Sequence, residues 1–247
     1  MTPSAVQALE GVGPRPSHSR PSPDVRAGDV LLGPVLVDCL TGDEFSPGAS
    51  GRRLHLPRNH VVYRPGDPAA ELYVVESGAV AIARTAPDGR ELFIDLIGSG
   101  DVFGLCSLFD GGKRATRARA LEPSSVVVLS YDSVRRLSEG RPTLTWGLGA
   151  LVAGRLRRTE SALVDSVFLD VTGRTAKYLL AAAGPREEFV LALTQEELAA
   201  VVGASRERVN KSLAMFVRLG WIDHHDRRYR IRDRLQLVRR AEVAEQE

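Results

Sequence analysis

Residues Leu193–Ile222 read "LTQEELAAVVGASRERVNKSLAMFVRLGWI", and this stretch contains two signals for the start of a helix. Thr194, followed three residues later by Glu197, forms a capping box, in which each side chain can satisfy a free backbone N–H of the other residue. Gly203 allows a tight turn, and Ser205 can cap a second helix. Apolar residues recur at helical spacing in both segments. The stretch therefore predicts two short helices joined by a glycine turn.

The second of these helices has a polar, mostly basic outer face. Its outward residues include Arg206, Glu207, Asn210 and Lys211. The Arg206 guanidinium can pair with two acceptors of guanine, and the Glu207 carboxylate can accept from cytosine N4. We therefore interpret the pair as a helix-turn-helix whose second helix enters the major groove of double-stranded DNA. Two ordinary packed helices are the alternative interpretation.

The segment Trp221–Arg232, "WIDHHDRRYRIR", predicts two short strands around a turn. Such a hairpin forms a wing beside the helix-turn-helix, and its guanidinium groups suit DNA phosphates. Residues 171–240 hold 14 basic and 8 acidic residues, a net charge of +6, whereas the whole chain carries only +2. On charge alone, a solvated basic face is the alternative. The candidate DNA-binding residues are Thr194, Ser205, Arg206, Glu207, Asn210, Lys211, Arg227, Arg228 and Arg230.

The 247-residue chain has the composition of a globular protein, with 43% apolar and 26% charged residues. No run approaches 18 apolar residues, so we expect no membrane span, and the first 30 residues lack the order of a secretory signal. Cys39 and Cys106 lie far apart, which argues against a disulfide framework, a zinc site or an iron–sulfur cluster and favours a reducing, cytoplasmic compartment. We find no catalytic motif and expect neither an enzyme nor a metal site.

The segments before the helix-turn-helix differ from it in composition and in the spacing of their apolar residues. Residues 1–28 are rich in proline and predict a disordered arm, and Leu31–Leu40 predicts one short helix. Between Arg52 and Leu129, short alternating apolar runs are separated by turn signals about every ten residues. This spacing is typical of an antiparallel sandwich, barrel or roll. Pro142 can then open a long helix that runs to about Val167.

The predicted long helix carries one narrow apolar stripe. Its members follow one another at spacings of three or four residues: Leu148, Val152, Leu156, Thr159, Leu163 and Val167. A narrow stripe flanked by charged residues is typical of a coiled-coil contact, so we expect two copies of the chain to dimerise here. The alternative is that the stripe packs on the β region of its own chain.

Several stretches resemble the Crp–Fnr family of transcription regulators. Gly203–Ile222 resembles the family's recognition helix, and "FLDVTGR" (Phe168–Arg174) resembles the junction between its long helix and its DNA-binding domain. Three further stretches resemble its cyclic-nucleotide-binding β-roll: Arg64–Val80, Asp88–Gly104 and Phe109–Ala120. The resemblance extends over nearly everything outside the arm and the tail.

The resemblance implies an α+β fold in three parts. These are an N-terminal cyclic-nucleotide-binding-like β-roll sensor in 29–141, a dimerisation helix in 142–168 and a C-terminal winged helix-turn-helix in 169–240, followed by a tail in 241–247. It also implies a homodimer that binds a pseudo-palindromic operator, with RNA polymerase as a further partner. Arg206 and Glu207 match base-reading positions of the family, and Lys211 matches a third that is often arginine.

In family members that bind cyclic AMP, a glycine, an arginine and a neighbouring hydroxyl hold the phosphate, and a glutamate accepts from the ribose. Here Gly104 and Arg114 match, whereas Leu105 replaces the glutamate and Ala115 replaces the hydroxyl residue. Two lost hydrogen bonds cost roughly 2–6 kcal/mol, or about 30-fold to 10⁴-fold in affinity. We therefore do not expect control by ordinary tight cyclic AMP binding. The candidate ligand-binding residues are Gly104, Leu105, Cys106, Arg114, Ala115, Thr116, Thr159 and Glu160.

Several alternatives remain open for this cradle. It could bind another nucleotide or anion through Arg114, or it could be vestigial. Arg114 could instead form a structural pair with Asp110 or with loop carbonyls, and Cys106 could be a redox sensor or a buried small hydrophobe. For the whole chain, the alternatives are a regulator that depends on cyclic AMP, cyclic GMP or cyclic di-GMP, and a small-molecule receptor that acts mainly through protein contacts.

Overall fold

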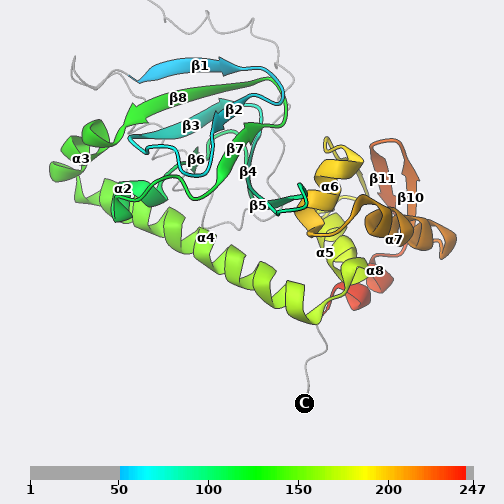
Figure 1. Ribbon diagram of the computed structural model, residues 1–247. Helices are drawn as coiled ribbons and strands as arrows, with labels where there is room; N and C mark the ends of the chain where they lie inside the picture. Colours follow the sequence, from blue (N-terminus) through cyan, green and yellow to red (C-terminus); the bar gives the residue numbers. More distant parts are fainter. Residues whose placement is uncertain (1–50, 243–247) are drawn as a thin grey trace, which may run out of the picture.

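The computed structural model describes residues 51–242 and is shown in Figure 1. The predicted arm 1–28, the predicted helix Leu31–Leu40 and Cys39 lie outside these residues. Within them, a β-rich part is followed by one long helix and then by a second, smaller unit of helices and short strands (Figure 1). This order confirms the α+β fold expected from the sequence.

Two antiparallel four-stranded sheets form the β-rich part, which we call the roll. Their strand orders are β1-β8-β3-β6 and β2-β7-β4-β5. The bounds are β1 Arg52–Leu56, β2 Val61–Tyr63, β3 Glu71–Ser77, β4 Val80–Thr85, β5 Glu91–Ile97, β6 Val102–Phe103, β7 Arg117–Ala120 and β8 Ser124–Ser130. The turn between β3 and β4 needs a glycine, because Gly78 has a φ of 90° and packs against Ser124. The alternating runs and their turns predict an antiparallel sandwich, barrel or roll, and the resemblance to the Crp–Fnr family implies the roll.

Three helices are associated with the roll. They are α2 (Cys106–Asp110), α3 (Tyr131–Glu139) and α4 (Pro142–Phe168). The first turns of α4 bury Leu144 and Leu148 against Leu72 and Leu129 of the sheet. Further along α4, Arg155 Nε lies 3.1 Å from Asp95 Oδ2, and the Arg155 guanidinium also donates to the Val102 carbonyl. The first half of α4 is therefore part of the core of the roll.

The C-terminal unit packs four helices and three short strands around one apolar core. Its elements are α5 (Val171–Ala183), β9 (Glu188–Val190), α6 (Gln195–Val202), α7 (Arg206–Arg218), β10 (Ile222–His225), β11 (Arg228–Ile231) and α8 (Arg234–Ala241), with the sheet order β10-β11-β9. The core stacks Phe216 on Trp221 and Phe189 on Tyr229. The sequence predicts α6, α7 and the β10–β11 hairpin, whereas α5, β9 and α8, like α3 beside the roll, were not predicted from it.

The C-terminal unit lies against the roll of the same chain. Figure 1 shows α6 beside β5, and Ala200 of α6 belongs to one buried cluster with Phe93 of β5. Among residues 51–242, no helix is both long enough and apolar enough to cross a membrane.

Candidate nucleic-acid interface and sensor cradle

Both helix starts of the helix-turn-helix form as the sequence predicts. Thr194 Oγ1 accepts from the Glu197 N–H at 3.1 Å, and Glu197 Oε2 accepts from the Thr194 N–H at 2.8 Å, which completes the capping box of α6. Gly203 ends α6 with a φ of 69°, in the left-handed region that glycine tolerates best. Ser205 Oγ then accepts from the Arg208 N–H and starts α7. A turn of three residues therefore joins the two helices.

The two faces of α7 divide as predicted. Val209, Leu213 and Phe216 are buried, whereas Arg206, Glu207 and Lys211 are exposed and Asn210 is half-buried. Lys211 Nζ lies 2.7 Å from Glu207 Oε1, one turn away on the same face. This hydrogen bond and the charge of Lys211 lower the pKa of Glu207. The Glu207 carboxylate therefore stays ionised at neutral pH and can accept from a base edge.

The wing presents the three predicted arginines. Arg227, Arg228 and Arg230 are all exposed on the β10–β11 hairpin, whose turn includes Asp226 with a φ of 53°. Arg230 forms an ion pair with Glu188 of the adjacent strand β9. The sequence alone does not predict this partner, because β9 is only three residues long and lies 42 positions before Arg230. Part of the charge of Arg230 is therefore already neutralised within the sheet.

In the cradle, the Arg114 guanidinium is buried and bound by groups of the protein itself. Arg114 Nη1 donates to the Gly104 carbonyl and to the Tyr131 hydroxyl, both at 3.0 Å, and Nη2 donates to the Glu71 carbonyl. The Tyr131 hydroxyl also donates to the Gly104 carbonyl, at 2.6 Å. Of the two structural partners considered for Arg114, the contacts are therefore with backbone carbonyls, at Gly104 and Glu71, and not with Asp110. The carboxylate of Asp110 instead accepts from the Gly112 N–H.

Aromatic rings surround the same guanidinium. Arg114 Cζ lies 4.4 Å from the centroid of the Tyr63 ring and 5.7 Å from that of Tyr73. The rings of Tyr73 and Phe103 stack with centroids 4.8 Å apart. Burial, together with the nearby Glu71 carboxylate, raises the pKa of Tyr73 to about 12. A desolvated guanidinium between rings is a favourable cation–π arrangement. No pattern in the sequence predicts it.

The other candidate ligand-binding residues of the cradle differ in exposure. Leu105 is 1% exposed and packs in the core between the roll and α4, with Leu108 and Tyr131. Cys106 is a free, exposed thiol, so its interpretation as a buried small hydrophobe is wrong. Ala115 is exposed and Thr116 is half-buried. Leu105 is therefore a core residue, and a glutamate there would bury a carboxylate.

The stripe on α4 has two environments. Leu148 is buried and Val152 packs against the core of the roll, so these two residues serve their own chain. This finding corrects the prediction of one continuous dimer seam. Thr159 and Glu160, the two long-helix ligand candidates, are exposed. The exposed apolar residues of the second half of α4 are Leu156, Leu163, Val164, Val167 and Phe168.

Two family models match the chain, a cyclic nucleotide-binding domain over residues 53–141 and a Crp-like helix-turn-helix domain over residues 173–240. The CRP-like cAMP-activated global transcriptional regulator of Mycobacterium tuberculosis (strain H37Rv) is 43% identical over 192 residues, which cover 75% of this chain and 86% of the relative. The cAMP-activated global transcriptional regulator CRP of Escherichia coli O157:H7 is 31% identical over 176 residues, 68% of this chain and 84% of the relative.

Solved structures show the same architecture. FixK2 from Bradyrhizobium japonicum superposes with a TM-score of 0.71 at 23% identity, over 79% of this chain and 100% of that one. The c-di-GMP responsive global regulator CLP of Xanthomonas campestris gives 0.67 at 26% identity, over 83% and 99%. Both domain types occur here in the same order and over most of the length of the relatives. The chain therefore belongs to the Crp–Fnr family of DNA-binding transcription regulators and carries that family's cyclic-nucleotide-binding domain.

Proposed function

We propose that the chain is a homodimeric, sequence-specific transcription regulator whose binding to DNA is not switched by tight binding of cyclic AMP. The observation that carries this proposal is the state of Arg114. Three of its hydrogen bonds go to Gly104, Glu71 and Tyr131, and a phosphate would have to compete with them. Leu105, in the core, offers the ribose no acceptor.

On the DNA side, the dimer would place one α7 helix in each half-site of a pseudo-palindromic operator, with the half-sites one helical turn apart. Arg206, Glu207 and Lys211 would read base edges, while Thr194, Ser205 and the wing arginines would contact phosphates. RNA polymerase is the expected protein partner at the promoter. Support comes from the exposure of α7 and of the wing.

A second candidate is a regulator that does depend on a cyclic nucleotide. One observation in the structure favours it, because the Nε of Arg114 is buried with no hydrogen-bond partner. The relatives named above also include proteins described as cAMP-activated and as c-di-GMP responsive. An anion that accepted from Arg114 Nε would satisfy the unpaired group.

Operator binding with and without nucleotide separates the two candidates. An operator is first selected from random duplex DNA, and affinity is then measured by fluorescence anisotropy with no ligand, with cyclic AMP, with cyclic GMP and with cyclic di-GMP. We expect full affinity without ligand and less than a twofold change with cyclic AMP. An increase of tenfold or more with cyclic AMP would establish the second candidate instead.

The DNA-reading assignment has its own test. Arg206→Ala should cost about 1–3 kcal/mol and relax the preference at one base pair, whereas a phosphate contact such as Arg227→Ala should weaken all sequences alike and reduce the salt dependence. If Arg206→Ala binds the selected operator as tightly as the wild type, α7 is not the reading helix.

A further inference from the structure

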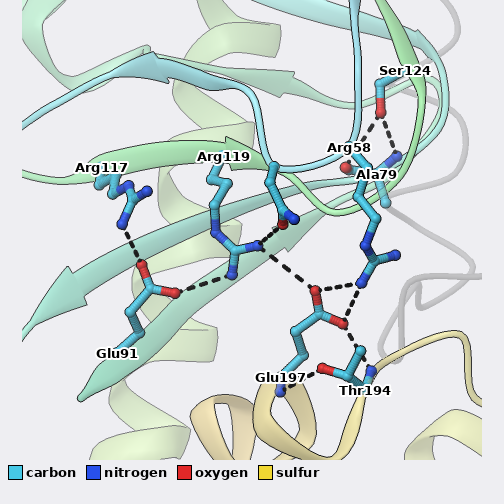
Figure 2. A network of polar contacts seen from close by, with 9 residues as sticks. Arg58, Ala79, Glu91, Arg117, Arg119, Ser124, Thr194 and Glu197 are labelled. Atoms are coloured by element: carbon cyan, nitrogen blue, oxygen red, sulfur yellow. Dashed lines mark hydrogen bonds and ion pairs between the residues drawn. The ribbon is translucent and has the colours of Figure 1, made fainter. Parts of the chain in front are cut away.

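A buried carboxylate joins the helix-turn-helix to the roll. Glu197 Oε1 lies 2.8 Å from Arg58 Nη2, and Glu197 Oε2 lies 3.1 Å from the same nitrogen. Arg119 Nη1 lies 3.7 Å from Glu197 Oε1. Figure 2 shows both guanidinium groups reaching from the roll toward the start of α6. The two sides of this contact are 139 residues apart in sequence.

Glu197 serves the helix and the roll at the same time. The carboxylate that completes the capping box of α6, by accepting from the Thr194 N–H, is the one that Arg58 binds. Its side chain is only 7% exposed. A buried carboxylate needs a cationic partner, and within its own helix it has only backbone partners. The start of the helix-turn-helix therefore satisfies its buried charge with arginines of the other unit.

A second carboxylate fixes the position of Arg119. Glu91 of β5 lies 3.0 Å from Arg119 Nη2 and 2.8 Å from Arg117 Nη1, and the Asn59 Oδ1 accepts from Arg119 Nη1 at 2.8 Å. Arg119 is 11% exposed, and its guanidinium lies 5.6 Å from the Phe93 ring centroid. We name the group Arg58, Glu91, Arg119 and Glu197 the Glu197 clamp. Arg119 therefore has partners within the roll besides Glu197.

Small apolar residues lie beside the clamp. Ala200 of α6 is buried with Ala81, Ala83, Phe93 and Leu121 of the roll. The alanines on both sides allow the helix to approach the sheet closely, as small residues do at packed interfaces. The contact therefore combines a desolvated ion-pair group with an apolar patch, and both come from the same two units.

Docking through α6 leaves the recognition surface free. Arg206, Glu207 and Lys211 on α7 and the wing arginines are exposed in this arrangement. The junction between the long helix and the C-terminal unit is short, since only Leu169 and Asp170 separate α4 from α5. Two residues are enough to form a hinge. Besides the chain connection, the ion pair between Lys177 of α5 and Asp165 of α4 crosses this junction, with 2.7 Å between Nζ and Oδ1, and the contact of Glu197 with Arg58 connects the unit to the roll.

We propose that the Glu197 clamp holds the DNA-binding unit of its own chain in the orientation that binds the operator, without a ligand. This inference rests on the proposed function in one respect, because it takes operator binding as the output. The two α7 helices of a dimer must lie one helical turn of DNA apart. A unit that swings about the hinge satisfies this only part of the time, and the apparent dissociation constant rises by the inverse of that fraction.

The substitution Glu197→Gln tests the clamp while sparing the helix. A glutamine at this position still completes a capping box, but it removes the charge that pairs with Arg58. Glu196→Gln is the matched control, because Glu196 is exposed in the same helical turn. Removing a negative charge near DNA should by itself strengthen DNA binding, because it reduces repulsion of the phosphates. Weaker binding by Glu197→Gln alone would therefore come from the lost contact with Arg58 and not from a change in repulsion of the DNA.

The first readout needs no DNA. Hydrogen–deuterium exchange of Glu91–Ile97 reports on the docked state, because β5 is an edge strand of its sheet and lies beside α6. We expect faster exchange there in Glu197→Gln, and in Arg58→Gln, whose α6 sequence is unchanged. Exchange in Glu196→Gln should equal the wild type. Equal exchange in all four proteins would overturn the proposal.

The second readout is operator affinity without ligand. We expect Glu197→Gln to bind about tenfold more weakly, as when the competent fraction falls from near one to about a tenth, and Glu196→Gln to bind no more weakly than the wild type. Equal or tighter binding by Glu197→Gln would overturn the proposal. If the wild type itself bound no operator, the proposed function would fail, while the exchange of β5 would still decide whether the clamp holds the two units together.

Discussion

Replacing Arg114 by methionine distinguishes a structural arginine from one reserved for a ligand. Methionine keeps most of the volume of the side chain and removes the guanidinium. A guanidinium reserved for a phosphate is a buried charge that awaits its partner, so its removal from the ligand-free protein should be neutral or stabilising. A guanidinium that holds the roll together should, when removed, leave its acceptors unsatisfied and destabilise the fold.

The magnitude follows from the three acceptors. Hydrogen bonds to a charged group contribute about 1.5–3 kcal/mol each, but several kcal/mol of this gain offset the cost of burying the guanidinium. The Gly104 carbonyl would keep the Tyr131 hydroxyl as a donor, whereas the Glu71 carbonyl would lose the bond from Arg114 Nη2. We therefore expect Arg114→Met to lower the free energy of unfolding by about 3 kcal/mol, the upper end of the cost of leaving one buried polar group without its hydrogen bond.

Urea unfolding of the ligand-free protein measures this change. The near-ultraviolet circular dichroism of tyrosine reports on the roll, because Tyr63, Tyr73 and Tyr131 all lie against Arg114. With slopes of about 1–3 kcal/mol per molar urea, the midpoint should fall by about 1–3 M. Arg84→Met, at an exposed arginine of β4, is the control and should leave the midpoint unchanged. A midpoint for Arg114→Met at or above that of the wild type would refute the structural role.

Three further predictions concern other parts of the molecule. Thr194→Ala removes the cap of α6 and should destabilise the C-terminal unit by about 1 kcal/mol, measured by thermal unfolding through Trp221 fluorescence; no change would show that the cap contributes nothing. Leu163, 64% exposed in one chain, should lie in the dimer seam, so Leu163→Glu should give the monomer mass in light scattering, and a persistent dimer would place the seam elsewhere. Folding keeps Tyr73 neutral up to a pKa of about 12, against 10.0 for an ordinary tyrosine. Its contribution to stability is therefore fully present below pH 10 and is lost as the pH rises toward 12, and Tyr73→Phe should flatten this part of the curve of unfolding free energy against pH.

The sequence predicted the helix-turn-helix closely because its signals are local. The partners in the capping box are three residues apart, the turn glycine lies next to the second cap, and each helix shows its own apolar face. Strand β9 could not be found this way, because three residues show no periodicity and it forms only by pairing with β11. Short elements of this kind depend on tertiary contacts and not on their own sequence.

The cradle shows a different limit. Aligned motifs identified Gly104 and Arg114 as a pair, and the structure does bring them within hydrogen-bond distance. The other partners of Arg114 are 17 and 43 residues away, at Tyr131 and Glu71, and no pattern in the sequence connects them. The sequence likewise shows only that Leu105 stands where the family has a glutamate. Its burial depends on α4, which packs over it.

The long helix and the Glu197 clamp together make a closed frame. One side is α4, about 40 Å long at 1.5 Å per residue, which is rooted in the roll and ends at the hinge. The C-terminal unit is the second side, and the clamp returns it to the roll. In such a frame the C-terminal unit cannot rotate about the hinge at Leu169 and Asp170 while the Glu197 clamp is intact. The clamp consists of ion pairs beside a patch of small side chains, whereas α4 is an unbroken helix. The contacts of the clamp should therefore be lost before α4 unfolds.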